Sequence, residues 1–113
     1  MHELSIAQSI INIVEESVCL QPGERVLTVE MVAGELTGIV TETMEFCFEF
    51  AAKDTVAQGA RLTVETVPVM GRCKDCGREF AVENYNFVCP DCESTRIDMV
   101  SGTELYVKQV EVE

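Results

Sequence analysis

Several features are scarce in this sequence of 113 residues, and each shortage argues against a class of function. Basic side chains are few, because eight Lys and Arg stand against twenty Asp and Glu, for a formal net charge of -12. Nucleic acid is therefore disfavoured as a partner, since a phosphate backbone requires a basic surface. No apolar run approaches the roughly 20 residues of a membrane span. The start is acidic where a signal peptide would be basic, so we expect a cytoplasmic protein without membrane insertion.

Groups that commonly carry catalysis are also scarce. The chain has a single histidine, His2, and so offers no histidine pair for acid–base work. It also lacks the GxxxxGK[ST] loop that cradles nucleotide phosphates. We therefore predict that the protein is not an enzyme.

Cysteine, in contrast, is plentiful, and four of the six cysteines form two C-x2-C pairs separated by twelve residues: Cys73, Cys76, Cys89 and Cys92. This spacing lets two tight turns bring four sulfurs to one tetrahedral ion. Gly77, directly after the first pair, suits a turn that requires positive φ. The pattern predicts a structural zinc site, and four thiolates leave no open coordination position for catalysis.

Other interpretations of these cysteines remain. Two disulfides or redox-active CxxC motifs are possible, but a thioredoxin-like motif occurs singly at the start of a helix in a βαβ unit, which this segment lacks. Iron in a rubredoxin-like site is the closest chemical competitor, because tetrahedral thiolate suits either ion. In a reducing compartment Cys19 and Cys47 are expected to be unpaired.

The hydrophobic pattern predicts two helices and three strands. A helix of about four turns is predicted from about Leu4, and it ends before residues 21–23. Ser5 and Gln8 have the spacing of a capping box, and a start one or two residues earlier remains open. A second helix is predicted over 41–53, where Phe46 and Phe50 widen the apolar stripe. Alternating residues predict strands over 25–33, 61–67 and 104–112. Gly34 is expected to break the first strand.

The order of these elements predicts an α+β fold. The last strand is too short to stand alone, so it is expected to pair with the earlier strands under two helices. The domains are then 1–68 plus 101–113, an α+β domain on a three-stranded sheet, and 69–100, an inserted zinc-ribbon-like module. Linkers are expected at 67–71 and 99–102, and the module is expected to pack around its metal through Phe80, Val82, Tyr85 and Phe87. The larger domain carries most of the negative charge, so a large partner should present a basic surface.

The amino terminus offers a second set of metal ligands. A lone histidine is usually a solvated residue, but position 2 allows chelation by the Met1 amine, the following amide nitrogen and the His2 imidazole. The amide or carboxylate of Glu3 can supply a fourth donor. Planar nitrogen-rich ligation favours Ni(II) or Cu(II) over zinc.

Five stretches together resemble a known family, in the same order along the chain: Met1–Ile10, Gly34–Gly38, Glu45–Glu49, Gly59–Leu62 and the four-cysteine segment. The chain resembles the HypA/HybF hydrogenase maturation proteins, which are nickel metallochaperones, over essentially its full length. The resemblance implies transient nickel at Met1, His2 and Glu3 and structural zinc at Cys73, Cys76, Cys89 and Cys92. It also implies two partners, the nickel-handling GTPase HypB and the [NiFe]-hydrogenase large subunit.

The chain departs from some members of that family at two places. Val40 stands where some relatives have a further polar nickel ligand. Gly77 and Glu93 follow the two C-x2-C pairs, beside which some relatives have a histidine. Histidine exchange at zinc is therefore not expected here. The competing functions are a rubredoxin-like electron carrier, which requires iron, and a zinc-ribbon interaction module.

Overall fold

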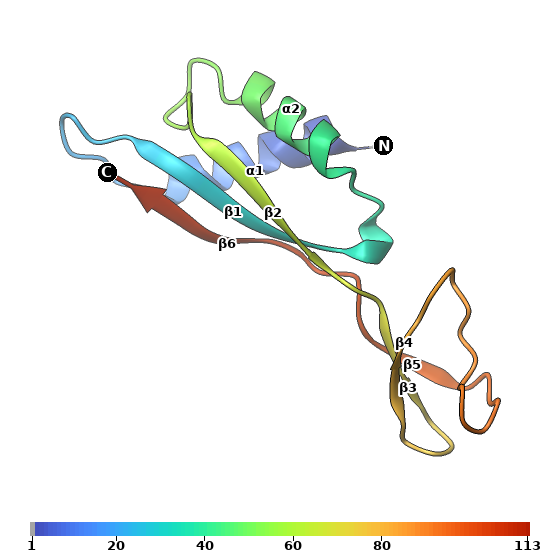
Figure 1. Cartoon of the computed structure of the whole chain (residues 1–113). Coiled ribbons are helices and arrows are strands. Elements are labelled where there is room, and N and C mark those ends of the chain that lie inside the picture. The colour runs from blue at the N-terminus through green and yellow to red at the C-terminus, as the bar shows by residue number, and fades with distance from the viewer. Residues whose placement is uncertain (1) are drawn as a thin grey trace. The chain divides into compact units, whose positions relative to one another are not determined.

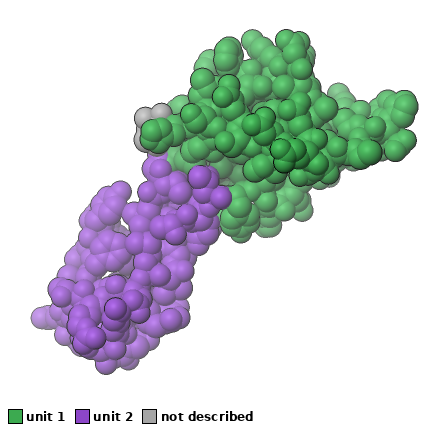
Figure 2. All heavy atoms as spheres, turned by 180° about the vertical axis from the view of Figure 1, so that it is seen from behind, with its two compact units in different colours: residues 1–32, 39–65, 106–113 green, residues 33–38, 66–105 purple. Residues whose placement is uncertain are grey.

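The computed structural model describes residues 2–113 as two helices, one 3-10 turn and six strands. In chain order these are α1 (Glu3–Ser17), β1 (Val26–Gly34), η1 (Glu35–Thr37), α2 (Thr41–Ala51), β2 (Arg61–Val67), β3 (Met70–Cys73), β4 (Glu79–Ala81), β5 (Ile97–Ser101) and β6 (Leu105–Val112). The chain divides into two compact units (Figure 2), of which unit 1 comprises 1–32, 39–65 and 106–113, and unit 2 comprises 33–38 and 66–105.

The first sheet has three strands in the order β2-β1-β6. Strand β6 returns to pair with β1, as the sequence predicts. Arg25 and Glu113 exchange backbone hydrogen bonds of 2.8 and 2.9 Å beside these strands, which is the signature of an antiparallel pair. Both helices lie over the same face of this sheet (Figure 1). The α+β fold predicted from the sequence is therefore confirmed.

The core of unit 1 forms where the helices meet β1. The apolar stripe of α1 is buried at four positions, and α2 contributes Met44 and Phe48, which are 0% and 1% exposed. Burial of large apolar side chains such as these contributes about 1.5–3 kcal/mol each. Met44 therefore serves packing, and Cys47 on the same helix is half-buried. The buried stripe of α1 consists of Ala7, Ile10, Ile11 and Val14.

A second three-stranded sheet, in the order β4-β3-β5, lies within unit 2. Strand β3 begins within the predicted linker 67–71, and β5 includes 99–101 of the predicted linker 99–102, so these two segments are partly strand and not simple linkers. Both neighbours of β3 are antiparallel, with Gly71 opposite Phe80 on β4 and opposite Met99 on β5. The three strands are three to five residues long, which is too short for an alternating pattern to be recognised.

Gly34 does not break β1 but closes it, because the strand includes this residue. A Cβ at Gly34 would lie 2.1 Å from the carbonyl carbon and oxygen of Gly102, so two backbones approach more closely than any side chain permits. The Gly34 amide donates to the Glu104 carbonyl at 2.7 Å, and the Leu36 amide donates to the Gly102 carbonyl at 2.8 Å. The close approach of the two backbones therefore requires glycine at position 34. The prediction that Gly34 breaks the strand missed this role.

Candidate metal centre

The two cysteine pairs fold into knuckles with the same backbone hydrogen bonds. In the first knuckle the Cys73 amide donates to the Arg78 carbonyl, and the Gly77 amide donates to the Cys73 carbonyl, both at 2.9 Å. In the second, Cys89 pairs in the same way with Ser94 and Glu93, again at 2.9 Å. Each turn thus reverses the chain over six residues and directs two sulfurs to one side.

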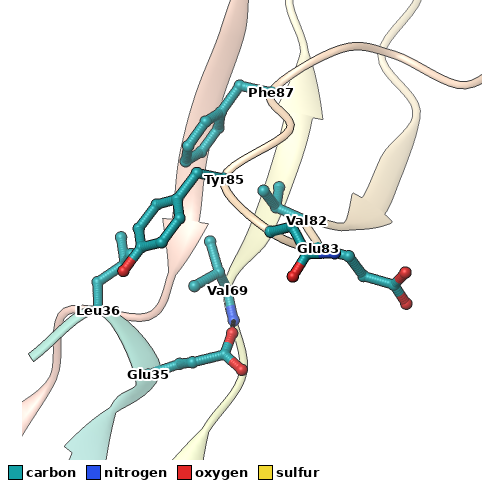
Figure 3. Close-up of a pocket in the computed structure, with 8 residues that line it drawn as sticks. Glu35, Leu36, Val69, Val82, Glu83, Tyr85 and Phe87 are labelled. Atoms are coloured by element: carbon teal, nitrogen blue, oxygen red, sulfur yellow. Dashed lines mark hydrogen bonds between the residues drawn. The ribbon is translucent and has the colours of Figure 1, made fainter. Parts of the chain in front are cut away.

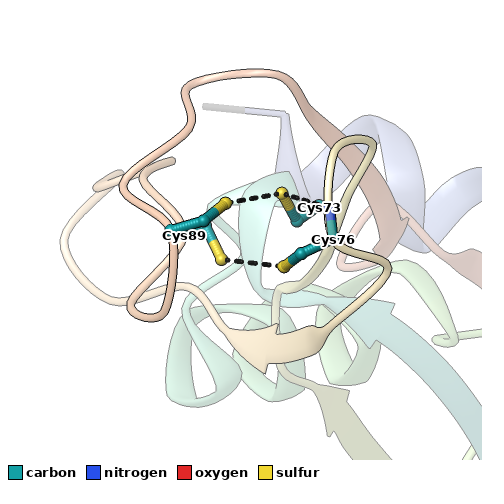
Figure 4. Close-up of side chains that lie close together, drawn as sticks. Cys73, Cys76 and Cys89 are labelled. Carbon is teal, nitrogen blue, oxygen red and sulfur yellow. Dashed lines mark hydrogen bonds between the residues drawn. The ribbon is translucent and has the colours of Figure 1, made fainter.

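The four sulfurs converge (Figure 4). The Sγ atoms of Cys73 and Cys92 are 3.5 Å apart, as are those of Cys76 and Cys89, and all four lie within 4.8 Å of one another. Zinc bound by four thiolates at about 2.3 Å separates its sulfurs by about 3.8 Å, so the tetrad fits a tetrahedral zinc ion. All six cysteines are free thiols in this structure, which does not support the disulfide interpretation.

Backbone amides, burial and the neighbouring sulfurs together move the pKa values of the four thiols apart. The backbone amide of Cys76 lowers the pKa of Cys73 to about 6, and that of Cys92 lowers the pKa of Cys89. The backbone amide of Ser94 favours the Cys92 thiolate, but the neighbouring sulfurs of Cys73 and Cys89, together with burial, raise the pKa of Cys92 to about 12. Four adjacent negative charges repel one another, so complete ionisation of the tetrad requires a bound cation.

Apolar side chains support the tetrad from one side. Cys73 and Cys89 are 1% and 0% exposed and form one buried cluster with Val69, Phe80 and Val82. Leu36, Phe87 and Ile97 pack against this cluster. Phe80, Val82 and Phe87 therefore pack as predicted.

Tyr85 corrects that prediction, because it is 75% exposed. Its ring stands beside Leu36 at a shallow pocket of about 430 Å³, which is also lined by Glu35 and Val69 (Figure 3). Asn84 and Tyr85 form a turn in which both residues have positive φ, 53° and 60°. Such φ values in residues other than glycine cannot be inferred from hydrophobic pattern.

Charged pairs connect the two knuckles on the surface. Arg78 of the first knuckle pairs with Asp91 of the second. Asp75 accepts a hydrogen bond from Arg96 at 3.0 Å and one from the Ser94 hydroxyl. All these charged side chains are substantially exposed, so each pair adds little stability by itself. The pairs join the two knuckles beside the sulfurs.

The fifth residue of each knuckle provides a matched test of the turn. Gly77 has φ +80° and nothing within 4 Å of a Cβ built on it, whereas Glu93 occupies the equivalent position at φ +61°. Gly77→Ala should therefore cost about 1–2 kcal/mol through backbone strain alone. Chelator titration of the zinc-loaded protein should show zinc released about 5–30-fold more readily, since 1.4 kcal/mol corresponds to tenfold.

The control is Glu93→Gly. This change relieves the strain at Glu93 but adds conformational freedom to the unfolded chain, and the two effects largely offset each other. The variant should therefore retain zinc about as well as the unmodified chain. Equal zinc retention by Gly77→Ala and the unmodified chain would contradict the backbone strain expected for a side chain at position 77.

Two of the predicted nickel ligands, His2 and Glu3, lie at the start of α1, and they differ in burial. His2 is exposed and is the N-cap residue, with its carbonyl accepting the Ile6 amide at 2.9 Å. Glu3 is only 4% exposed, and its carboxylate accepts the Val40 amide at 3.3 Å. Met1 lies outside the described residues. The structure therefore brings His2 and Glu3 to one helix end, which Glu3 ties to the start of α2.

Sequence reasoning did not detect this anchor and misplaced the cap of the helix. Glu3 and Val40 are 37 residues apart, so no local pattern connects them. The predicted capping box at Ser5 and Gln8 is not formed, because α1 begins at Glu3 without a side-chain cap. The acidic Glu3 in the first turn instead suits the positive end of the helix dipole.

Within residues 2–113, the group of three or more His, Cys, Asp or Glu that could hold a metal is the cysteine tetrad, and its four thiolates close the coordination sphere. None of the helices in this part of the chain is long and apolar enough to cross a membrane. The fold and the site define a class: small α+β proteins with a four-cysteine cluster that fits a zinc ion.

Comparison with known proteins defines the family. A family model described as hydrogenase/urease nickel incorporation, metallochaperone, hypA matches residues 1–112. The hydrogenase maturation factor HypA of Geobacter metallireducens is 48% identical over 113 residues, and that of Geotalea uraniireducens is 45% identical, each with both chains fully covered. The chain belongs to the HypA family of nickel metallochaperones, which act in hydrogenase maturation and are not enzymes.

Solved structures agree with this assignment. The solution structure of the Ni metallochaperone HypA from Helicobacter pylori has a TM-score of 0.66 and 26% identity, covering 98% of this chain and 97% of that one. A second solution structure of HypA protein has a TM-score of 0.70, also at 26% identity, covering 98% of this chain and 95% of that one. The fold is therefore shared over nearly the whole length.

Proposed function

We propose that this protein binds Ni(II) through Met1, His2 and Glu3 and delivers it to the large subunit of a [NiFe]-hydrogenase, in cooperation with the GTPase HypB in the cytoplasm. The observation that carries the proposal is the contrast at the start of α1. Glu3 is buried and hydrogen-bonded to Val40, whereas the adjacent His2 is exposed. The terminus thus has a fixed base and an accessible imidazole.

The chemistry of these groups supports nickel. The Met1 amine, the next amide nitrogen and the His2 imidazole can close two small chelate rings around one ion, and nitrogen-rich planar sites favour Ni(II). The burial of the Glu3 carboxylate leaves its amide as the more accessible fourth donor, because the first amides of a helix lack partners within the helix. Glu3 would then contribute through its backbone, while its side chain positions the terminus.

The cysteine tetrad has a different role in this proposal. Zn(II) bound by Cys73, Cys76, Cys89 and Cys92 would hold the two knuckles together and order the 69–100 module, which is too small to fold on its own apolar core. The other part, 1–68 plus 101–113, would carry the nickel. A closed zinc site does not surrender its ion readily, whereas a site at a chain end can receive and release one.

Adding a metal-inert extension before Met1 tests the terminal chelate. Blocking the amine should abolish stoichiometric nickel binding while leaving zinc content at about one per chain, measured by equilibrium dialysis with metal analysis. In the unextended protein, nickel affinity should decrease at least about tenfold per pH unit below about 7.7, because protons compete for an amine whose usual pKa is about 7.7–8.0.

Proteolytic removal of the extension, restoring the free Met1 amine, is the matched control and should restore nickel binding. Full-affinity nickel binding by the extended protein would rule out the amine as a ligand. Stoichiometric iron in the purified protein would instead favour the rubredoxin-like alternative.

A further inference from the structure

The outward side of α2 carries two aromatic side chains that nothing in the described structure covers. Phe46 and Phe50 are 71% and 56% exposed. They are four residues apart and so lie on the same stripe of the helix. Two phenyl rings at this spacing resemble the anchors by which amphipathic helices enter apolar grooves. Exposure of large apolar rings to water is unfavourable, and adjacent exposed rings typically mark a surface that binds another molecule.

The charges around the two rings indicate what that occupant must carry. Glu42, Glu45 and Glu49 flank the rings on α2, all three are exposed, and within the described residues none forms an ion pair. The ammonium of Lys53 lies 5.6 Å from the centre of the Phe50 ring. Arg61 lines a hollow with Glu45 and Glu49 at the flank of the helix. We call Phe46, Phe50 and the three carboxylates the α2 aromatic face.

A second copy of the chain is a poor occupant on electrostatic grounds. Unit 1 has twelve acidic and four basic side chains, a net charge of -8. Pairing two such faces would place unpaired carboxylates opposite one another in a region shielded from water, and like charges there are strongly unfavourable. A surface bearing Lys or Arg around an apolar groove would instead pair with these carboxylates and bury both rings.

The position of the face connects it to the start of α1. The Val40 amide at the beginning of α2 donates to the Glu3 carboxylate, and the Val40 side chain is 54% exposed. Phe46 follows Val40 by six residues, which is about 9 Å along a helix. A protein bound to this face would therefore contact α2, and the start of α2 is hydrogen-bonded to Glu3, the residue after His2.

We propose that the α2 aromatic face is the docking surface for a protein partner whose apolar groove is bordered by Lys and Arg side chains, and that docking brings this partner within reach of the terminal nickel site. Phe46 and Phe50 are the anchors, and the three glutamates set orientation and association rate. The inference rests on the proposed function, because docking matters only if nickel is delivered from the amino terminus. Binding of a partner to the surface can nevertheless be tested without nickel.

The test uses the full-length zinc-loaded protein with two purified probes from the same organism, the nickel-handling GTPase and the hydrogenase large-subunit precursor. Affinities are compared for the unmodified chain, a Phe46→Ala/Phe50→Ala double variant and Tyr106→Ala. Tyr106 is 53% exposed on β6 and provides a control for removing a surface ring elsewhere in unit 1. A Glu45→Gln/Glu49→Gln variant tests the charges.

We expect at least one probe to bind the unmodified chain and to bind the double variant at least tenfold more weakly, with Tyr106→Ala unchanged. The glutamine variant should slow association, and added salt should slow it for the unmodified chain. Unchanged affinity of the double variant for both probes would overturn the proposal, as would failure of both probes to bind. A self-associating chain that becomes monomeric in the double variant would identify a second copy as the occupant and overturn it equally.

Nickel binding separates this inference from the function on which it rests. The double variant should bind nickel as the unmodified chain does, because neither ring belongs to the proposed ligand set. Loss of nickel binding in that variant would assign the face to the metal site and contradict a docking role. Loss of nickel binding in an amino-terminally extended chain that still binds its probe would confirm the terminal site and leave the docking surface intact.

Discussion

Cys76→Ser should release zinc and disorder unit 2 while unit 1 stays folded. Structural zinc typically contributes about 10–16 kcal/mol of apparent binding free energy, and removing one of four thiolates leaves a site that competes poorly with water and protons. The buried cluster beside the tetrad contains only Val69, Phe80 and Val82 besides two ligands, so little apolar burial would remain to hold it. Zinc content should fall from about one per chain to a small fraction.

Amide hydrogen exchange locates the effect. The Val82 amide, bonded to the Val69 carbonyl at 2.9 Å, should lose its protection, whereas the Val18 amide at the end of α1 should exchange as before. Cys19→Ser is the matched control, because Cys19 is an exposed free cysteine outside the tetrad. Retained zinc and unchanged Val82 protection in Cys76→Ser would show that the tetrad does not hold the metal.

His2→Ala should remove nickel delivery without disturbing the fold. The His2 side chain is exposed, so its removal creates no cavity, and the backbone carbonyl that accepts the Ile6 amide is retained. Cells carrying this variant should contain normal amounts of the zinc-loaded protein but little active hydrogenase at low nickel. Excess nickel in the medium should restore part of the activity, since the role of a metallochaperone is to speed delivery.

Two substitutions at Glu3 separate anchoring from metal ligation. Glu3→Gln retains a side-chain oxygen that can accept the Val40 amide and should keep most activity if the carboxylate only positions the terminus. Glu3→Ala leaves that amide without its partner, which costs about 1–3 kcal/mol where the group is buried, and should loosen the terminus. Equal, complete loss of nickel binding in both variants would instead make the carboxylate a ligand.

The sequence predicts the larger elements and the tetrad because their signals are local. Strand β2 spans the predicted 61–67, and the long apolar stripe of α1 places that helix within a residue or two. The cysteine spacing predicts two turns around one metal ion, and the four sulfurs do converge in the structure. The residues are Cys73, Cys76, Cys89 and Cys92. Patterns that repeat within a few residues are therefore sufficient for these features.

Features that depend on distant contacts or on φ were missed. Strands β3 to β5 are too short to show a period, and the Gly34–Gly102 approach joins residues far apart in sequence. The predicted wide apolar stripe of α2 included Phe46 and Phe50, yet these lie on the exposed side. Hydrophobic periodicity predicts that a helix has an apolar stripe, but it does not predict how many residues of that stripe are buried in the core.

The central claim is that nickel reaches the hydrogenase through the amino terminus of this chain. Its most direct test is the nickel content of the hydrogenase large subunit purified from cells grown at low nickel, with either the unmodified chain or His2→Ala as their only copy. The account predicts a large subunit that is loaded with nickel in the first strain and nearly nickel-free in the second, at equal abundance of the zinc-loaded protein. Equal nickel loading in the two strains would contradict it.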